Sequence, residues 1–361
     1  MSDELDPGDK ALLRDIQAFN RTYAASGWHL QDKVVTEDLS GIALVRSSMT
    51  SVQFLHVHWR NAILTNTQFT NVEFQQSDFT GATFHDVVFK DCKFKICSFA
   101  RARLNDCRFV NCTSEELNAR DATFEACGFE SFEDNSGVFG SAAFHKCRYE
   151  RGRMDNSSFY SSKFTDFSVK QTACENVSFA DIEGTNLLFE DAAIHNCSFT
   201  GGHYGKVAFE RGQSKGLTFK EFHPQEIAIQ NCEKIEALSV LNSMWSSPTI
   251  AACPAIFELT IDESRIEDLT ISHSRIAYFE MEETQISGNS RISDCEISGL
   301  NLEKSTLTGT HMINCVLAKY LMASGATLDG VVLSGITYAP GLEISASDAK
   351  YLNGSPQFGV R

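Results

Sequence analysis

Twelve cysteines are the residues of this sequence best suited to metal or redox chemistry. Cys92 and Cys97, and then Cys107 and Cys112, stand five residues apart. Zinc motifs most often pair cysteines across two intervening residues, whereas four intervene here. A spacing of five therefore favours a structural repeat in which cysteine fills a small inward position, over a metal or disulfide site.

The histidines and paired carboxylates form no catalytic pattern either. His56 and His58 lie close together but have no third ligand at metal-binding spacing. The pairs Asp262-Glu263 and Glu282-Glu283 would need a pocket to act as general acid and base. No G-x-S-x-G, H-E-x-x-H or P-loop motif occurs in the sequence. We therefore expect no enzyme activity, no catalytic residue, no cofactor and no bound metal.

Phenylalanine recurs at every fifth position over a long stretch. From Phe54 to Phe219 there are 34 positions spaced five residues apart without an insertion, and 20 of them hold Phe. The position two residues earlier prefers small residues such as Ala62, Ser77 and Cys92. This period fits neither a helix nor a strand, but a chain that turns a corner every five residues. Four such sides predict coils of about 20 residues, stacked at about 4.8 Å.

Residues 20 positions apart confirm this period within the sequence itself. One column repeats phenylalanine with a single gap at Ala119, and another repeats cysteine. Rings stacked at strand spacing would bury a continuous apolar core, and the small residues would leave room for them. The core positions predicted in this way are Phe79, Phe99, Phe139, Phe159, Phe179, Phe199, Phe219, Cys107, Cys127 and Cys147.

The alternation of a small residue, a polar residue and a central Phe or Leu resembles the pentapeptide-repeat family. Segments 62–66, 77–81 and 305–309 show it clearly, and the pattern recurs along most of the chain. The resemblance implies an all-β fold, a right-handed quadrilateral β-helix. It does not imply one particular activity.

The filling of the predicted core changes near Lys220. From Ile261 onward aliphatic residues take the central position, and extra residues shift the phase after Ile286 and after Met322. Residues 9–25 have helical spacing and are expected to cap the first coil, because an open ladder end would aggregate. The predicted organisation is a helical cap at 1–33, a Phe-rich β-helix at 34–220, an irregular junction at 221–255, an acidic Ile/Leu-rich β-helix at 256–340 and a C-terminal tail at 341–361. Whether the β-helix is continuous through 221–255 is left open.

Charge is distributed unevenly along the chain, whose net charge is −16. From Glu37 to Lys220 there are 23 acidic and 19 basic residues, and from Glu221 onward 18 and 8. The acidity argues against direct nucleic-acid binding and is compatible with a basic partner or with mimicry of a polyanion. The asymmetry reflects either ordinary solvated surfaces or two binding faces. On the second interpretation the candidate partner-binding residues are Glu258, Asp262, Glu263, Glu267, Asp268, Glu280, Glu282 and Glu283, with the basic run Lys90, Lys93, Lys95, Arg101, Arg103 and Arg108.

The N-terminal residues are acidic and contain no apolar run, and no stretch of about 18 apolar residues occurs. We therefore expect no membrane span and a cytoplasmic protein with reduced cysteines. Export through a specialised secretion system stays open.

Two functional hypotheses follow. The first is a rigid, non-enzymatic scaffold for a protein partner, and the family resemblance adds a bacterial adaptor, accessory or effector protein of a secretion system. The second, also implied by the resemblance, is a DNA mimic that binds and protects a type II topoisomerase such as DNA gyrase. The near-neutral Phe-rich segment and its basic run place the second hypothesis behind the first. A homodimer is compatible with both, and the sequence does not identify the partner.

Overall fold

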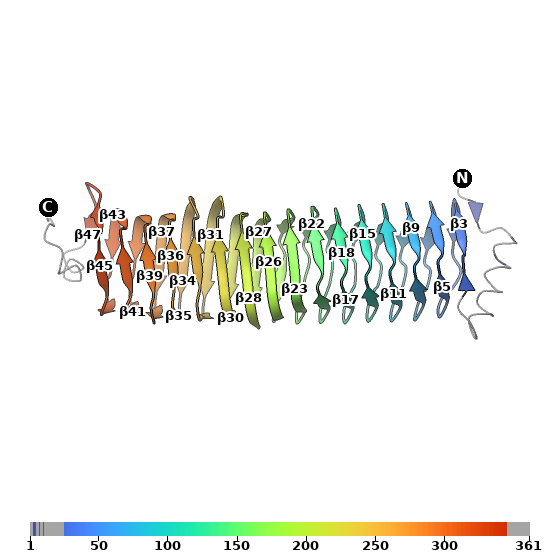
Figure 1. The fold of residues 1–361 in the computed structure, drawn as a ribbon, viewed down its shortest axis with the longest axis horizontal. Helices are drawn as coiled ribbons and strands as arrows, with labels where there is room; N and C mark the ends of the chain where they lie inside the picture. The colour runs from blue at the N-terminus through green and yellow to red at the C-terminus, as the bar shows by residue number, and fades with distance from the viewer. Residues whose placement is uncertain (1–2, 5–6, 8–9, 11–24, 345–361) are drawn as a thin grey trace. The chain divides into compact units, whose positions relative to one another are not determined.

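The computed structural model describes residues 3–4, 7, 10 and 25–344. The chain divides into two compact units, unit 1 from Met1 to Ala193 and unit 2 from Ile194 to Arg361. Each unit consists mainly of parallel β-ladders wound into coils (Figure 1). The all-β fold class predicted from the sequence is confirmed. The capping helix predicted over residues 9–25 falls almost entirely outside the described part of the chain, as do residues 345–361.

The first coil of unit 1 contains 19 residues, and from Ala43 onward its coils contain 20 residues in four sides of five. Parallel register joins residues 20 apart, as in Phe84 with Leu104 and Phe74 with Phe94. Side 1 contains β5 (Ala43–Val45), β8 (Ile63–Thr65), β11 (Thr83–His85), β14 (Arg103–Asn105), β17 (Thr123–Glu125) and β20 (Ala143–His145). Side 2 contains β6 (Ser48–Thr50), β9 (Gln68–Thr70), β12 (Val88–Lys90), β15 (Arg108–Val110), β18 (Gly128–Glu130) and β21 (Arg148–Glu150).

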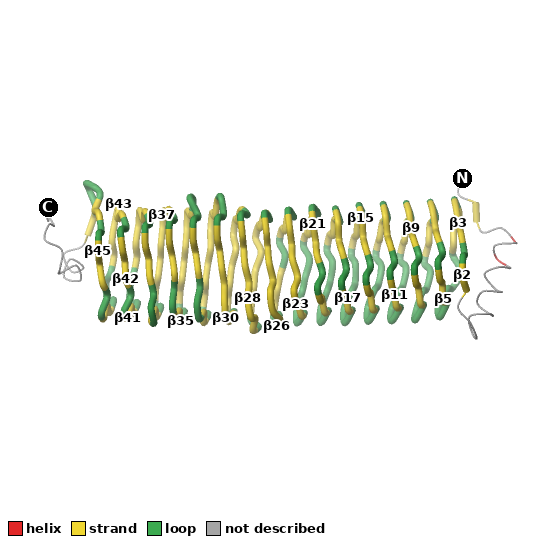
Figure 2. The backbone as a smooth tube through the Cα atoms, in the orientation of Figure 1, coloured by secondary structure: helices red, strands yellow, loops and turns green. Residues whose placement is uncertain are grey.

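The two remaining sides complete each coil. Side 3 contains β4 (Lys33–Val35), β7 (Gln53–Leu55), β10 (Glu73–Gln75), β13 (Lys93–Lys95), β16 (Thr113–Glu115), β19 (Glu133–Asn135), β22 (Arg153–Asp155) and β24 (Ala173–Glu175). Side 4 is held by single bridges such as Asp78 with Ser98, and ends in β25 (Ser178–Ala180). In the later coils sides 1 and 2 merge into β23 (Lys163–Lys170) and β26 (Glu183–Glu190), a change that Figure 2 shows as longer strands. The first turn adds β1 (Asp3–Glu4), β2 (Ala25–Ser26) and β3 (His29–Gln31).

One residue in each five-residue side makes the corner. It has left-handed backbone geometry, with φ of 50° at Asn66, 53° at Asn71 and 52° at Asp86. Asn and Asp tolerate this region better than most residues, which explains why they recur just before the small inward position. The five-residue period is thus a backbone requirement as well as a packing pattern.

The core of unit 1 consists of stacked side chains. The rings of Phe79 and Phe99 lie 4.7 Å apart, those of Phe139 and Phe159 4.7 Å, and those of Phe159 and Phe179 5.2 Å. These separations match the spacing of the ladder, so each ring covers the ring of the preceding coil. The small positions are also buried: the thiols of Cys107, Cys127 and Cys147 contact backbone carbonyls, as do those of Cys92, Cys97 and Cys112.

A break in this packing occurs on side 3. Phe54, Phe74 and Phe94 stack there, and the next two inward positions hold Ser114 and Asp134. Asp134 is only 2% exposed. Its carboxylate accepts hydrogen bonds from the Ser114 hydroxyl at 2.5 Å and the Ser157 hydroxyl at 2.6 Å.

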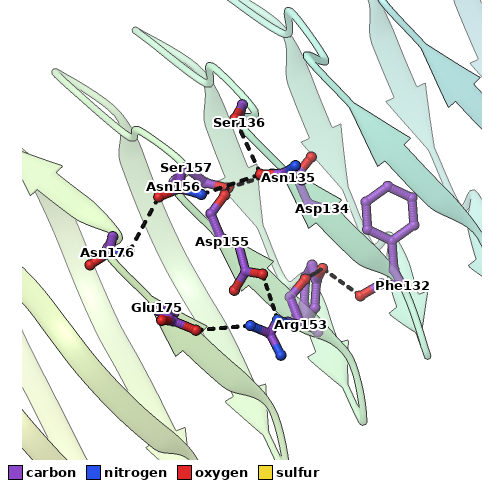
Figure 3. A network of polar contacts seen from close by, with 11 residues as sticks. Phe132, Asp134, Asn135, Ser136, Arg153, Asp155, Asn156, Ser157, Glu175 and Asn176 are labelled. Carbon is purple, nitrogen blue, oxygen red and sulfur yellow. Dashed lines mark hydrogen bonds and ion pairs between the residues drawn. The ribbon is translucent and has the colours of Figure 1, made fainter.

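The surroundings of Asp134 differ from the rest of the core (Figure 3). Tyr149 donates its buried hydroxyl to the carbonyl oxygens of Phe132 and Arg153, at 2.7 and 2.9 Å. On the outer surface, Arg153 contacts Asp155 and Glu175. A cavity of about 20 Å³ adjoins Asp134 and is otherwise lined by aromatic and aliphatic side chains.

Unit 2 alternates long and short strands. One sheet contains the long strands β27 (Ala193–Thr200), β29 (Gln213–Lys220), β31 (Lys234–Leu241), β34 (Ile256–Asp262), β37 (Arg275–Glu282), β40 (Glu296–Asn301) and β43 (Val316–Met322), followed by β46 (Thr337–Tyr338) and β47 (Glu343–Ile344). We call this the long-strand sheet. The opposite sides contain β28 (His203–Glu210), β30 (His223–Gln230), β32 (Met244–Trp245), β33 (Thr249–Ala251), β35 (Arg265–Glu267), β36 (Thr270–Ser272), β38 (Gln285–Ser287), β39 (Arg291–Ser293), β41 (Thr306–Thr308), β42 (His311–Ile313), β44 (Thr327–Asp329) and β45 (Val332–Ser334).

Extra residues lengthen some coils of unit 2 from 20 to 21 residues. His203 pairs with His223, 20 positions later, but Gln213 pairs with Lys234, 21 positions later. Within 221–255, expected to be an irregular junction, β30 and β31 keep parallel register with their neighbours, and the irregularity is the added residue. The core also changes here, because the Phe199–Phe219 stack meets Trp245 edge-on. Aliphatic columns follow it.

Candidate partner-binding surface of unit 2

The basic residues singled out in the sequence do not form one surface. The register of unit 1 places them around the whole coil, and Lys95 already pairs with Glu115 at 3.6 Å. They lie on side 2 (Lys90, Arg108), side 3 (Lys93, Lys95), side 1 (Arg103) and the corner before it (Arg101). The structure thus separates the residues that look clustered in the sequence.

The acidic residues behave differently, because most of them converge on the long-strand sheet. Asp262 and Glu282 are direct register partners at the ends of β34 and β37, and Glu280 lies two residues before Glu282. Glu263 and Glu283 follow the two strands at the adjoining corner, where both have positive φ. We call these five residues the acidic cluster. Glu258 lies farther back on β34, whereas Glu267 ends β35 and Asp268 follows it, both on another sheet.

The electrostatics of the acidic cluster show that its charges act on one another. Burial raises the pKa of Asp262, and the carboxylates of Glu282, Glu283 and Glu280 raise it further. Lys304 places its Nζ 3.1 Å from an oxygen of Glu282 and 3.1 Å from one of Glu283. Lys304 thus pairs with two of the five carboxylates, and Arg265 lines the adjoining groove, so the cluster keeps an excess of negative charge.

A surface groove of about 570 Å³ runs beside this cluster. Successive corner residues Glu221, Asn242, Glu263 and Glu283 form one wall, with φ between 46° and 54°. The other wall consists of outward side chains from strands that follow the corner. They are His203, His223, Met244, Arg265 and Gln285.

The wall opposite the carboxylates is partly fixed by backbone contacts. Nδ1 of His223 accepts a hydrogen bond from the Met244 amide at 3.0 Å, and the Met244 side chain is exposed. Exposed methionine adapts its shape to different contacts. The groove therefore combines a charged wall with an adaptable wall.

Three aromatic residues lie on the long-strand sheet itself, within β34, β37 and β43, and form what we call the aromatic ridge: Phe257, Tyr278 and Tyr320. Phe257 is 49% exposed and Tyr278 is 50% exposed. The Nζ of Lys234 lies 5.5 Å from the centre of the Phe257 ring. Large exposed rings next to carboxylates are typical of protein contact surfaces, where aromatic residues are enriched.

The sequence alone indicated the acidic cluster but neither the groove nor the ridge. The groove depends on which residues occupy successive corners, and the 21-residue coils move these residues out of the five-residue phase. Exposed Phe257 and Tyr278 could have been noticed as large rings outside the inward positions of the repeat. Asp134 was also missed, although it stands in phase with the phenylalanines.

No alternative chemical centre is evident in the part of the chain that the structure describes. There, no group of three or more His, Cys, Asp or Glu side chains is placed to hold a metal ion. All twelve cysteines are buried with free thiols, and burial raises the pKa of Cys97 to about 12. Among the same described residues, no helix is long and apolar enough to cross a membrane.

Both units are thus β-solenoids whose sides are built from short, repeating steps with a left-handed corner. A sequence model described as pentapeptide repeats matches eight copies within residues 47–86. The pentapeptide-repeat pattern recognised in the sequence is confirmed by this match. No curated protein sequence is significantly similar to it.

Solved structures with similar coils have low sequence identity to the chain. QnrB1, a plasmid-mediated fluoroquinolone resistance protein, is 15% identical with a TM-score of 0.29, covering 45% of this chain and 84% of its own. HetL, a pentapeptide-repeat protein from the cyanobacterium Nostoc, is 10% identical with a TM-score of 0.16, covering 92% and 95%. The A-module of the Azotobacter vinelandii mannuronan C-5 epimerase AlgE4 is 12% identical with a TM-score of 0.26, covering 96% and 98%. Similarity at TM-scores this low says nothing about the function of this chain.

Proposed function

We propose that this chain is a non-enzymatic scaffold and that unit 2 binds a positively charged segment of a partner protein. The observation that carries the proposal is the convergence of the acidic cluster beside the groove. Asp262, Glu280 and Glu282 lie on one sheet, and Glu263 and Glu283 connect that sheet with the groove wall.

The dimensions of the surface suit an extended peptide. Neighbouring coils are about 4.8 Å apart, so the corner from Glu221 to Glu283 extends over about 14 Å. An extended chain advances about 3.3 Å per residue, so roughly four residues would match this length. Lys or Arg at alternate positions would then face carboxylates on the wall. Such complementarity mainly favours fast association and partner selection.

A rigid solenoid is well suited to present such a surface. Each coil packs only on its neighbours, and outward residues can vary without disturbing the buried rings. The exposed carboxylates have no pocket around them that excludes water, which an acid–base mechanism would need. In this proposal the partner belongs to, or is carried by, a bacterial secretion system. The alternative is DNA mimicry directed at a type II topoisomerase.

A charge-reversal experiment tests the proposal. The full-length chain carrying Glu280→Lys, Glu282→Lys and Glu283→Lys would be compared with a control of equal charge change on unit 1, Glu115→Lys, Glu116→Lys and Glu125→Lys. A fluorescent peptide of four Gly-Lys repeats serves as the basic segment, and anisotropy measures its binding. We expect the cluster variant to lose affinity about tenfold or more and the control to change much less.

Equal loss in both variants would contradict the proposal, because it would indicate only non-specific attraction to an acidic protein. Binding of purified DNA gyrase by the wild type, abolished in the cluster variant while the basic peptide fails to bind, would establish DNA mimicry instead. Binding of the peptide without binding of gyrase supports the scaffold.

A further inference from the structure

Unit 1 contains an internal example of how this fold binds an arginine. Arg120, Gly140 and Tyr160 occupy the same outward position in three successive coils of side 4. The Tyr160 ring lies directly over Gly140, where a Cβ would be 2.1 Å from its Cζ. The guanidinium carbon of Arg120 then lies 5.8 Å from the centre of the ring. A glycine thus lets the tyrosine lie flat, and the flat ring receives a guanidinium.

The aromatic ridge of unit 2 repeats the glycine and the tyrosine. Tyr278, Gly299 and Tyr320 are register partners on β37, β40 and β43. A Cβ on Gly299 would be 2.4 Å from Cζ of Tyr320, so this ring also lies over its glycine. The position that corresponds to Arg120 holds Tyr278 instead. Unit 2 therefore has the flat tyrosine ring but no arginine at the position that corresponds to Arg120.

Carboxylates lie on the same sheet as the two tyrosines. Glu258 is the register partner of Tyr278, and Glu280 follows Tyr278 by two residues on β37. Glu280 acts on Tyr320 as well, because its charge, together with burial and Tyr278, raises the pKa of the Tyr320 phenol. Asn301 donates a hydrogen bond to one oxygen of Glu280 at 3.2 Å. The rings are thus bordered by negative charge on two sides.

We infer that Tyr278 and Tyr320, with Glu258 and Glu280, form a site for an arginine side chain of the basic partner. This inference rests on the proposed function and specifies the chemistry of the partner. The planar guanidinium stacks on the tyrosine rings while its N–H groups donate to the carboxylates. The Phe257 ring is not part of this site, because Lys234 of the chain already approaches its face.

The site discriminates arginine from lysine for physical reasons. A guanidinium is flat and weakly hydrated, and it offers several N–H donors in one plane, so it can stack and pair with carboxylates at the same time. An ammonium group is a strongly hydrated point charge and gains less from the ring faces. The acidic cluster attracts both cations, whereas the tyrosine pair favours only one of them.

The test compares two peptides of equal charge, four Gly-Arg repeats and four Gly-Lys repeats, binding to the full-length chain. We expect the arginine peptide to bind about fivefold more tightly. The double variant Tyr278→Ala and Tyr320→Ala should bind both peptides with the affinity of the lysine peptide. Tyr278→Phe with Tyr320→Phe should keep the preference, because the rings are retained. Tyr160→Ala in unit 1 is the matched control and should change neither affinity.

The outcomes distinguish this inference from the proposed function. Equal affinity of the two peptides for the wild type, or a preference that survives the double alanine variant, overturns the arginine site and leaves the scaffold intact. Failure of both peptides to bind overturns the proposed function, and the arginine site with it. Circular dichroism of the alanine variant, matching the wild type, assigns a lost preference to the missing rings and not to unfolding.

Discussion

The carboxylate of Asp134 accepts a hydrogen bond from the hydroxyl of Ser157 at 2.6 Å, inside the aromatic core of unit 1. Burial raises the pKa of Asp134, and the hydrogen bonds from Ser114 and Ser157 only partly oppose this effect. The nearby carboxylate of Asp155 raises the pKa further. We therefore expect Asp134 to resist ionisation more strongly than an exposed aspartate.

The neutral acid also suits the hydrogen-bond geometry. As a carboxylate, Asp134 accepts the Ser157 hydroxyl proton; once protonated, Asp134 can donate to the Ser157 oxygen instead, which frees that hydroxyl to donate to the Asp155 carbonyl at 3.1 Å. The Ser114 hydroxyl donates to the other carboxyl oxygen. The side chains of Ser114, Asp134 and Ser157 then all have partners, which a buried polar network requires.

The raised pKa predicts a specific dependence of stability on pH. Above the ordinary aspartate value of 3.8, the unfolded chain loses the proton of this residue while the folded chain keeps it. The folded state then binds more protons, so the contribution of Asp134 to stability falls as pH rises through the interval up to its folded pKa. Asp134→Asn cannot ionise, and its melting temperature should fall less than that of the wild type over this interval.

Melting temperatures measured from pH 4 upward would check this prediction. Asp121→Asn, at an exposed corner, is the control and should follow the wild-type curve. Parallel curves for the wild type and Asp134→Asn would show that Asp134 titrates like an exposed residue.

The two glycines near Asp134 should be sensitive to added volume. A Cβ on Gly137 would lie 2.2 Å from Oδ2 of Asp134, and one on Gly152 would lie 2.3 Å from the carbonyl oxygen of Phe132. Gly137→Ala and Gly152→Ala should each destabilise unit 1 by about 1–3 kcal/mol, because a packed core absorbs extra atoms only by shifting. Urea unfolding would measure the loss. Gly128→Ala is the matched control, since its Cβ would meet nothing closer than 4.0 Å. An equal loss of stability in this variant would show that the destabilisation comes from the backbone preference of alanine and not from the added volume.

The sequence predicted most of the fold because the repeat is a local code. The sequence of each five-residue side shows which residue points inward and which one forms the corner. Phe79 could therefore be assigned to the core and Asn66 to a corner without any knowledge of distant contacts. Asp134 could not be explained in this way. Ser114 is the register partner of Asp134 on side 3, and Gly137 and Ser157 occupy one position of side 4 in successive coils. The 20-residue spacing thus brings them together, but it does not show that an aspartate is accepted at an inward position.

The candidate surface was only partly predictable for a similar reason. The sequence composition indicated the acidic segment. The strand register, however, determines that Asp262 lies beside Glu282 on the long-strand sheet and that Asp268 does not. Register in unit 2 depends on single added residues, such as the one between Gln230 and Lys234. Each addition moves all later residues by one position relative to the ladder below. The basic run of unit 1 shows the converse, since residues close in sequence point in four directions around a coil.

The cysteine thiols should be unreactive in the folded protein. All twelve are buried, so the reagent reaches them poorly whichever way the pKa moves: burial raises the pKa of Cys97 to about 12, whereas a hydrogen bond with the Cys295 thiol lowers the pKa of Cys315 to about 7. Ellman's reagent at pH 8 should therefore label the native chain slowly and all twelve thiols quickly after denaturation. An added exposed thiol, Thr123→Cys, is the positive control and should react within minutes. Rapid labelling of several native thiols would contradict the burial of these columns.

Phe159→Asp should unfold unit 1 even though the same unit accommodates Asp134. The Phe159 ring stacks between Phe139 at 4.7 Å and Phe179 at 5.2 Å, and Phe144 and Phe164 lie within 6 Å of it. A carboxylate there would be surrounded by rings, without the hydroxyl donors that Asp134 has, at a cost of several kcal/mol. Phe159→Leu keeps the site apolar and should cost less, about 1–3 kcal/mol. Circular dichroism and limited proteolysis would compare the two variants. A folded, protease-resistant Phe159→Asp chain would show that position 159 does not face the core, because no other placement removes the burial penalty.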